Sequence, residues 1–339
     1  MKKVKKVVQL ALVSTLILAL VGCGASKPST DTTGTQGTNA PKQLTKVKLG
    51  YFGNTCEAPL IAAYEKGFLK DEGIDAEMIK GDANTLKDGL ATGKIDATDG
   101  LLMQWLKPIE AGLDIKFTAG LHTGCIQVLA PKDMPFTSFK DLKGKTIGVP
   151  AIGGGPMILV SRQLANEGLD SQKDVQWKVF PNSELPLALE KGEVDIISVA
   201  DPFAELTVTQ GKVKSIFNSA KDIPFEDEYC CLLVINGKMV EKDPETAAAI
   251  TRAFLKGAEW VNSNQTEIAQ IEVDKKYVPG DPTLNAKILA TYNFIPSIDG
   301  GADAVLKAAK EMKTIGVLNK DTDVEALAKA SFVRLKGVQ

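Results

Sequence analysis

Short apolar segments that alternate with helical segments constrain the fold of this chain more than any other feature. The first run starts at residues 46–52, where polar and apolar residues alternate as in a strand, and continues to an apolar segment over 126–130. The pattern starts again at 146–149 and ends with a strand over 213–217. Alternation of this kind is typical of largely parallel sheets flanked by helices. The sequence therefore predicts an α/β protein with two lobes, each a mostly parallel sheet covered by helices.

Glycines and capping residues set the expected limits of the other elements. Asn84 can accept hydrogen bonds from the free amides of a helix start, and Gly93 can end that helix. We expect further helices over 60–69, 101–111, 157–166 and 185–191, and further strands over 75–80, 95–98, 115–121, 175–180 and 194–199. Asp99-Gly100 and Asp201-Pro202 would then lie just beyond the carboxyl ends of two strands.

The last third of the chain is helical apart from one apolar strand over residues 229–235. Because helices without strands cannot form a third α/β lobe, we expect this strand to return to the first lobe and the helices to pack on it. The chain would then cross between the lobes near 131–138 and again near 221–229, which permits hinge closure over a cleft. The five expected helices cover 244–262, 266–277, 282–292, 303–315 and 324–335.

The first 23 residues have the pattern of a secretory signal. Four lysines within residues 2–6 precede an apolar run over 7–21 that is short for a membrane span. The run ends at Leu20-Val21-Gly22-Cys23, which resembles the bacterial lipobox, whose cysteine is lipidated and becomes the mature N-terminus. We therefore expect lipidation of Cys23 and anchoring on the extracytoplasmic face of the cell membrane. An ordinary signal peptide, or a membrane anchor with a chance cysteine, is the alternative.

Residues 24–44 are rich in Ser, Thr, Gly, Asn and Gln and contain almost no large apolar side chain. A segment of that composition cannot bury a core, so we expect a flexible tether. The rest divides into a first lobe (45–134), a second lobe (135–223) and a return to the first lobe (224–339). The net charge of −2 and the absence of a basic run argue against a nucleic-acid partner. We expect a monomer.

The turn that follows the first strand is the first place to expect a ligand. Gly53 ends the strand, and Pro59 lies in the first turn of the next helix, where its missing N–H costs nothing. Ligands of open α/β sheets bind beyond the carboxyl ends of strands, and free amides at a helix start can hold an anion. The intervening Asn54-Thr55-Cys56-Glu57 is therefore a candidate site. In the second lobe, Gly153-Gly154-Gly155 exposes amides at a helix start in the same way, unless it is simply a flexible turn.

Besides the lipobox cysteine, the chain contains four cysteines and one histidine. Cys56 and Cys125 follow predicted strands, whereas Cys230 and Cys231 begin the returning strand, where adjacent side chains point to opposite faces. Disulfides, a thiol pair in the cleft and inert buried thiols are all compatible with this placement. We expect no cofactor and no metal, with a soft-metal site of Cys56, His122 and Cys125 as a minor alternative.

Several stretches of the chain carry a family resemblance. They are Leu49-Gly50-Tyr51 before Pro59-Leu60, Glu65-Lys66-Gly67-Phe68 with Glu72-Gly73-Ile74-Asp75, Phe139-Lys140-Asp141-Leu142-Lys143-Gly144-Lys145-Thr146-Ile147-Gly148-Val149, and Gly192-Glu193-Val194-Asp195 with Asp201-Pro202. These stretches resemble the substrate-binding proteins of ABC importers for alkanesulfonates, taurine, nitrate and pyrimidine precursors. The likeness covers roughly residues 45–260.

The resemblance implies a two-lobed type II periplasmic-binding-protein fold. Such a protein holds a small molecule between its lobes and delivers it to an ABC permease, without catalysis. The ligand-binding loops of the family correspond here to Asn54, Thr55, Cys56, Glu57, Asp99, Gly100, His122, Cys125, Gly153, Gly154, Gly155, Asp201, Tyr229 and Cys230.

The acidic residues of these loops bear on the ligand. Glu57 and Asp99 would repel a simple anion, so we expect an uncharged, zwitterionic or cationic ligand, such as a heterocycle, rather than nitrate or a sulfonate. Two other functions stay open. One is an enzyme on the same fold with Cys56 or Cys125 as nucleophile and His122 as base. The other is a sensor whose closed form docks on a receptor.

Overall fold

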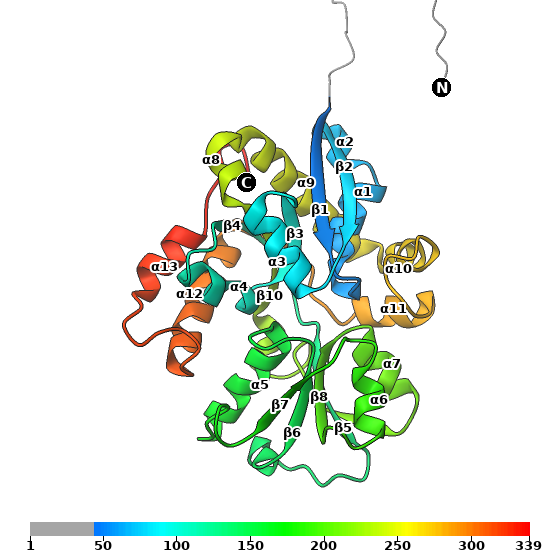
Figure 1. Ribbon diagram of the computed structural model, residues 1–339. Helices are drawn as coiled ribbons and strands as arrows, with labels where there is room; N and C mark the ends of the chain where they lie inside the picture. The colour runs from blue at the N-terminus through cyan, green and yellow to red at the C-terminus, as the bar shows by residue number, and fades with distance from the viewer. Residues whose placement is uncertain (1–43) are drawn as a thin grey trace, which may run out of the picture. The chain divides into compact units, whose positions relative to one another are not determined.

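Two five-stranded sheets flanked by helices make up the computed structural model, which describes residues 44–339 (Figure 1). The predicted signal segment, the lipidation site Cys23 and nearly all of the predicted tether lie outside the described residues. Within residues 44–339, no helix is long and apolar enough to cross a membrane.

The first sheet has the strand order β2–β1–β3–β10–β4. Its strands are β1 (Thr45–Tyr51), β2 (Ile74–Lys80), β3 (Ala97–Leu101), β4 (Ile115–Thr123) and β10 (Tyr229–Asn236). β1 pairs in parallel with β2 and β3, and β10 alone runs antiparallel to its neighbours. Four strands therefore point the same way, as expected of a mostly parallel sheet. The predicted return of the late apolar strand to the first sheet is confirmed.

The second sheet has the order β7–β6–β8–β5–β9. Its strands are β5 (Ile126–Pro131), β6 (Thr146–Val149), β7 (Gln176–Val179), β8 (Ile196–Ala200) and β9 (Val213–Asn218). β6 runs parallel to β7 and β8, whereas β5 is antiparallel to β8 and β9. The expectation that the strand at 126–130 belongs to the first lobe is therefore wrong. Alternation along the chain gives the order of strands but not the sheet that each one joins.

The two chain crossings between the sheets run side by side and form a hinge. The first is the short turn at Gly124 and Cys125, both with positive φ, and not the segment 131–138 that we predicted. The second crossing lies between β9 and β10, close to where we expected it. Ser219 donates its backbone N–H to the Ile126 carbonyl and accepts the Ile126 N–H on Oγ, both at 2.9 Å. A Cβ on Gly124 would lie 2.6 Å from that of Ala220, so the close approach requires glycine.

Helices cover both sheets, and some of their limits differ from the prediction. The helix expected at 60–69 is interrupted, because Gly67 has a φ of 81° and starts a new turn. Asp82, and not Asn84, caps the next helix by accepting the Thr85 N–H at 2.8 Å. These helices are α1 (Ala58–Glu65), α2 (Phe68–Asp71), α3 (Ala83–Thr92), α4 (Met103–Glu110), α5 (Gly155–Asn166), α6 (Leu185–Glu190) and α7 (Phe203–Thr209), with 3-10 turns η1 (Thr55–Glu57), η2 (Phe139–Leu142) and η3 (Phe225–Asp227).

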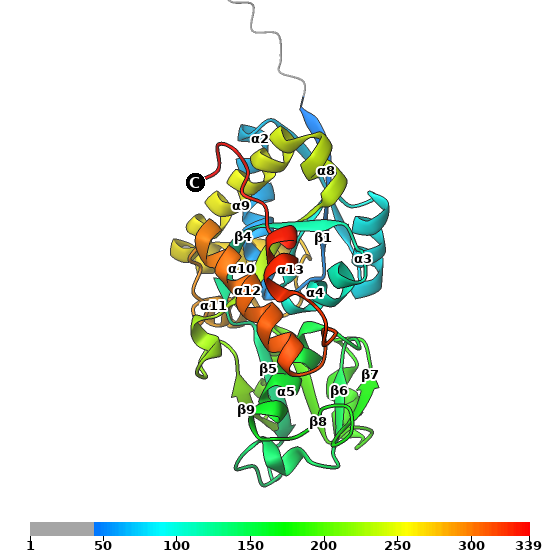
Figure 2. The same cartoon turned by 90° about the vertical axis from the view of Figure 1, so that its left-hand side faces the viewer.

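The C-terminal helices pack mainly on the first lobe. α9 lies against α1 and β4, and Phe254 of α9 and Phe117 of β4 are fully buried. α12 and α13 pack on β4, and α12 also reaches α5 of the second lobe (Figure 2). The helices are α8 (Gly237–Lys242), which we did not predict, α9 (Pro244–Ser263), α10 (Gln265–Asp274), α11 (Pro282–Leu289), α12 (Ile298–Thr314) and α13 (Val324–Ser331).

Candidate functional site

A cavity of about 310 Å³ lies between the two lobes, and we call it the cleft. The first lobe contributes the loops after β1 and β2, the end of β3 and the start of β10. The second lobe contributes the loops after β6, β7 and β8. The lining residues are Phe52, Asn54, Cys56, Glu57, Lys80, Gly81, Asp82, Ala83, Asp99, Gly100, Leu101, Gln104, Pro150, Ala151, Gly154, Pro156, Pro181, Asn182, Ser183, Ala200, Phe203 and Cys231.

The loop after β1 is shaped by the carboxylate of Glu57. It accepts backbone N–H groups from Phe52, Gly53 and Asn54 at 2.7, 2.7 and 2.8 Å. Burial raises the pKa of Glu57 to about 8, helped by the nearby Cys56 thiolate and opposed by these three amides. Because its oxygens are already engaged, Glu57 holds the loop in place rather than offering free acceptors to a ligand. The Thr55 N–H donates to the Asp201 carbonyl at 3.1 Å and so links this loop to the second lobe.

The residues that we predicted as ligand-binding fall into three groups. Six line the cleft: Asn54, Cys56, Glu57, Asp99, Gly100 and Gly154. Six lie outside its lining: the buried Thr55, His122, Cys125 and Asp201, with Gly153 and Gly155 beside Gly154. The last two, Tyr229 and Cys230, line a different cavity, on the hinge side of β10. β3 runs to Leu101, so Asp99 and Gly100 belong to the strand itself and not to a loop after it.

The glycine turn of the second lobe allows close packing against the first. Gly154 precedes α5, and Gly153 has a φ of 72°. A Cβ on Gly155 would lie 2.8 Å from the Leu101 side chain. The start of α5 can therefore approach β3 only because residue 155 is glycine.

Asp201 joins the lobes through its side chain and does not face the cleft. Its carboxylate accepts hydrogen bonds from Gln127 Nε2 at 3.0 Å, from the Tyr292 hydroxyl at 2.9 Å and from the Glu205 N–H at 3.2 Å. Burial raises the pKa of Asp201 to about 7 against the lowering effect of these donors. That Asp201 contacts the ligand stays a prediction, because its side chain is engaged between the lobes and lies outside the cleft lining.

All four cysteines of the described residues gather with the single histidine beside the cleft. They carry free thiols. Cys125 Sγ lies 2.7 Å from Cys230 Sγ and 4.0 Å from Cys231 Sγ. The ligating atoms of Cys56, His122 and Cys231 all lie within 4.8 Å of one another. We call these five side chains the thiol–imidazole cluster.

The strand start at Cys230 and Cys231 departs from simple alternation. β10 shifts register against β4 on both sides of Cys231. Such a bulge re-aims side chains, so both thiols lie near Cys125. As expected of adjacent strand residues, only one of the pair lines the cleft, although both thiols lie near Cys125. Cys231, which we did not choose as a site residue, lines the cleft, whereas Cys230 faces the hinge.

His122 is held in one orientation. Its Nδ1 lies 3.1 Å from the Thr123 carbonyl oxygen, which can only accept, so Nδ1 carries the hydrogen. The ring stacks on Tyr292, with centroids 5.7 Å apart, and contacts Phe294. Burial would lower the pKa of His122, but the neighbouring Cys56 and Asp99 raise it to about 9. Burial also raises the pKa of Asp99 well above its ordinary value.

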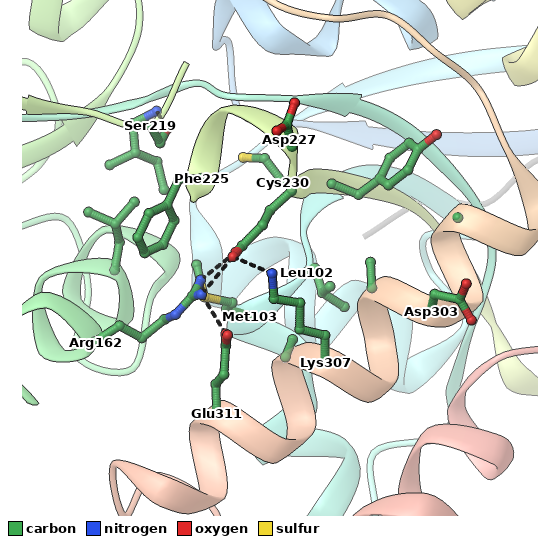
Figure 3. Close-up of a pocket in the computed structure, with 17 residues that line it drawn as sticks. Leu102, Met103, Arg162, Ser219, Phe225, Asp227, Cys230, Asp303, Lys307 and Glu311 are labelled. Carbon is green, nitrogen blue, oxygen red and sulfur yellow. Dashed lines mark hydrogen bonds and ion pairs between the residues drawn. The ribbon is translucent and has the colours of Figure 1, made fainter. Parts of the chain in front are cut away.

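A second cavity, of about 260 Å³, lies on the hinge side of β10 (Figure 3). Ion-paired side chains line one end of it. We call it the hinge pocket. Arg162 of α5 donates to Glu228 at 2.8 and 3.1 Å and also pairs with Glu311 of α12. Lys307 of α12 contacts Glu228 at 2.8 Å. Arg162 also lies over the Phe225 ring, 4.1 Å from its centroid. This network connects the second lobe, the hinge and the helix that packs on the first lobe.

The fold and the cleft define the class of this protein, a substrate-binding protein with the type II periplasmic binding fold. The chain belongs to the NMT1-like family, which matches residues 40–273. It is 27% identical over 295 residues to the nitrate/nitrite binding protein NrtA of Nostoc sp., covering 76% of this chain and 66% of that protein. The chain thus spans about two thirds of the length of that relative.

Two further comparisons cover most of the chain. The riboflavin-binding protein RibY of Chloroflexus aurantiacus is 23% identical over 358 residues, covering 94% of this chain and 95% of RibY. The crystal structure of the periplasmic nitrate-binding protein NrtA from Synechocystis matches with a TM-score of 0.73 at 20% identity, covering 86% of each chain, and shows the fold. These relatives are named as binding proteins and not as enzymes.

Proposed function

We propose that this protein is an extracytoplasmic solute-binding protein that captures a small molecule in the cleft and delivers it to an ABC import permease. The observation that carries the proposal is a cavity lined by strand-end loops of both lobes, next to a two-stranded hinge. A ligand that contacts both lobes favours their closed arrangement, and a permease can recognise that arrangement. Membership of the NMT1-like family supports the same function.

The lining of the cleft favours an uncharged, zwitterionic or cationic ligand, such as a heterocycle. Within the described lining, Lys80 is the only cationic side chain, and its Nζ already donates to the Tyr277 carbonyl at 3.0 Å. The buried Asp99 adds no positive charge that would attract a simple anion, and its ionised form would repel one. Phe52 and Phe203 offer apolar surfaces from opposite lobes, on which a planar ring could stack.

A thermal-shift screen of the full chain against cations, zwitterions and aromatic heterocycles tests this function. A true ligand should stabilise the fold by about 2.7 kcal/mol at a hundredfold excess over its dissociation constant. Phe203→Ala and Asn54→Ala should each weaken binding, because each removes a cleft contact from one lobe. Leu187→Ala removes an exposed apolar side chain of α6 outside the cleft and should leave binding unchanged. A ligand whose stabilisation is insensitive to both cleft variants would contradict the proposal.

Lipid anchoring through Cys23 is the second part of the proposed function. A lipidated chain is held on the membrane by burial of its acyl methylenes, at about 0.8 kcal/mol each. Cys23→Ser should therefore release the protein from washed membranes, and the mass of the mature N-terminus should lack the lipid. A Cys23→Ser variant that stays in the membrane fraction would exclude anchoring at this residue.

The proximity of Cys56 and His122 is also what the alternative enzyme would need, so chemistry on the ligand must be tested directly. A binding protein releases its ligand unchanged. We expect ligand eluted by denaturation to have the same mass before and after prolonged incubation with the protein. A time-dependent change of mass that Cys56→Ser abolishes would favour the enzyme.

A further inference from the structure

We propose that Cys56, His122 and Cys231 form a binding site for a thiophilic metal ion, zinc(II) in the first instance, at the floor of the cleft. The site goes beyond the proposed function, because it can be occupied whether or not a small molecule is bound. Three residues distant in sequence, from η1, β4 and the start of β10, bring two sulfurs and one imidazole nitrogen within 4.8 Å of one another. Sulfur and imidazole donors suit zinc and related soft ions.

The strongest support is a buried ring nitrogen without a hydrogen-bond partner among the described residues. His122 is fully buried, and Nε2 has no hydrogen-bond partner within residues 44–339. Because Nδ1 donates to the Thr123 carbonyl, Nε2 is the ring nitrogen left to bind a metal ion, and the ion would displace any proton that Nε2 carries. A histidine that binds a metal through one nitrogen and donates to a carbonyl through the other is the usual arrangement of metal sites. Buried polar atoms without partners are rare in folded proteins, so this one requires an explanation.

The charges around the site also suit a cation. Both carboxylate oxygens of Asp99 are buried and have no partner among the described residues. Two thiolates and a neutral imidazole would neutralise one zinc(II) ion, which reduces the cost of placing charge in a buried position.

Binding of a zinc ion requires the three ligand atoms to move only slightly closer together. With zinc–sulfur bonds of about 2.3 Å, two sulfurs of a tetrahedral site lie about 3.8 Å apart. The ligand atoms of Cys56, His122 and Cys231 lie within 4.8 Å before any ion is present, so rotation of the side chains suffices. Cys56 and Cys231 also line the cleft, which gives an ion a path of entry and leaves a fourth position toward the cavity.

A second thiol group, Cys125, Cys230 and Cys231, is also close enough to hold an ion, and Cys231 belongs to both groups. The histidine-containing group is favoured for two reasons. Cys125 and Cys230 already contact each other at 2.7 Å, and this group contains no histidine. The two assignments predict different effects on metal binding when Cys56 or Cys230 is substituted, so these substitutions distinguish between the assignments.

Cobalt(II) titration of the reduced, metal-free full chain under anaerobic conditions tests the site. We expect one cobalt(II) per chain, with thiolate-to-metal charge-transfer absorption and tetrahedral bands in the visible, displaced by one equivalent of zinc(II). Cys56→Ser and Cys231→Ser should each weaken binding by at least about 100-fold, because loss of a ligand exceeds the effect of changing an outer-shell residue. Each should also lower the charge-transfer intensity by about half.

Cys230→Ser is the matched control, because it changes a thiol of the same cluster outside the proposed ligand set. It should retain one cobalt(II) with unchanged absorption, and circular dichroism confirms that each variant is folded. Binding without charge transfer, or binding lost in Cys230→Ser but kept in Cys56→Ser, would overturn the assignment. If wild-type protein binds no cobalt(II) yet is stabilised by a small molecule, the metal site fails while the proposed binding function stands.

Discussion

The two sides of the start of β10 differ in how their buried polar groups are partnered. On the side of Cys230, in the hinge pocket, Arg162 is paired with two carboxylates. On the side of Cys231, at the cleft, His122 Nε2 and both oxygens of Asp99 have no partner within the part of the chain that the structure describes. Folded proteins pair nearly all of their buried polar atoms. The charged groups of the hinge pocket are thus held by ion pairs, whereas our proposals supply partners at the cleft floor through a bound ligand or metal ion.

The largest change in the free energy of unfolding is expected for a substitution in the hinge pocket. Arg162→Met removes the centre of the hinge network and leaves Glu228, which is only 14% exposed, beside a second carboxylate with Lys307 as its one remaining cationic partner among the described residues. Breaking a buried ion pair by removing one partner costs about 3 kcal/mol or more. We expect a loss of that size in the free energy of unfolding, measured by urea denaturation.

Arg252→Met is the control for that variant. Arg252 pairs with Glu72 nearer the surface, where both side chains are about one third exposed. Exposed pairs contribute at most about 1 kcal/mol, so the loss should be much smaller. Equal losses in the two variants would remove the distinction between the hinge network and an ordinary surface pair.

A smaller effect is expected on how the stability of the protein depends on pH in the acid range, when Glu228 of the hinge pocket is substituted. Burial alone would raise the pKa of Glu228, but hydrogen bonds and charges from Arg162 and Lys307 hold it below its ordinary value of 4.5. An acid with a lowered pKa in the folded state stabilises the fold above its unfolded pKa and loses that contribution as the pH falls through the folded pKa. Glu228→Gln should therefore be less stable at neutral pH, by about 1–3 kcal/mol, and should lose less stability below pH 4.5 than the wild type.

Urea denaturation at a series of pH values measures this slope. Glu190→Gln is the control, because Glu190 forms an exposed pair with Lys212 and should leave the profile of the wild type almost unchanged. A Glu228→Gln profile parallel to that of the wild type would show that the hinge network does not depend on the charge of Glu228.

The smallest change in the free energy of unfolding is expected for a substitution at the cleft floor. Asp99→Asn removes no hydrogen bond within residues 44–339, so we expect a change below about 1 kcal/mol at pH 4. Because burial raises the pKa of Asp99 well above 3.8, the folded state holds this proton more tightly than the unfolded state does. Stability of the metal-free wild type should therefore fall as the pH rises from 3.8 toward the raised pKa, and Asp99→Asn should lack this part of the fall.

The exposed Asp88→Asn provides the comparison for Asp99→Asn, since it makes the same chemical change on the surface of α3. It should follow the wild-type pH profile. A large destabilisation in Asp99→Asn at low pH would mean that Asp99 has structural partners, and the contrast between the two sides of β10 would be lost.

The sequence predicted what depends on local pattern. The two strand–helix runs, the returning strand and the helical end followed from periodicity, and strand ends indicated the loops with Asn54 and Gly154. The sheet joined by β5 did not follow, because strand alternation carries no information on pairing partners. Cys231 was missed because alternation allows only one of Cys230 and Cys231 to face the cleft but does not show which one. The Arg162 network was missed because its members come from three distant segments, α5, the hinge and α12.

The claim that the cleft binds a ligand is tested most directly by native mass spectrometry of the full chain, purified without chelator and compared with a denatured sample. The account predicts an additional mass on the folded protein that leaves on denaturation and is depleted in Asn54→Ala and Phe203→Ala. A zinc ion retained in those variants would be recognised separately by its mass. A folded protein that carries no additional mass, even after incubation with the full ligand panel, would contradict the account.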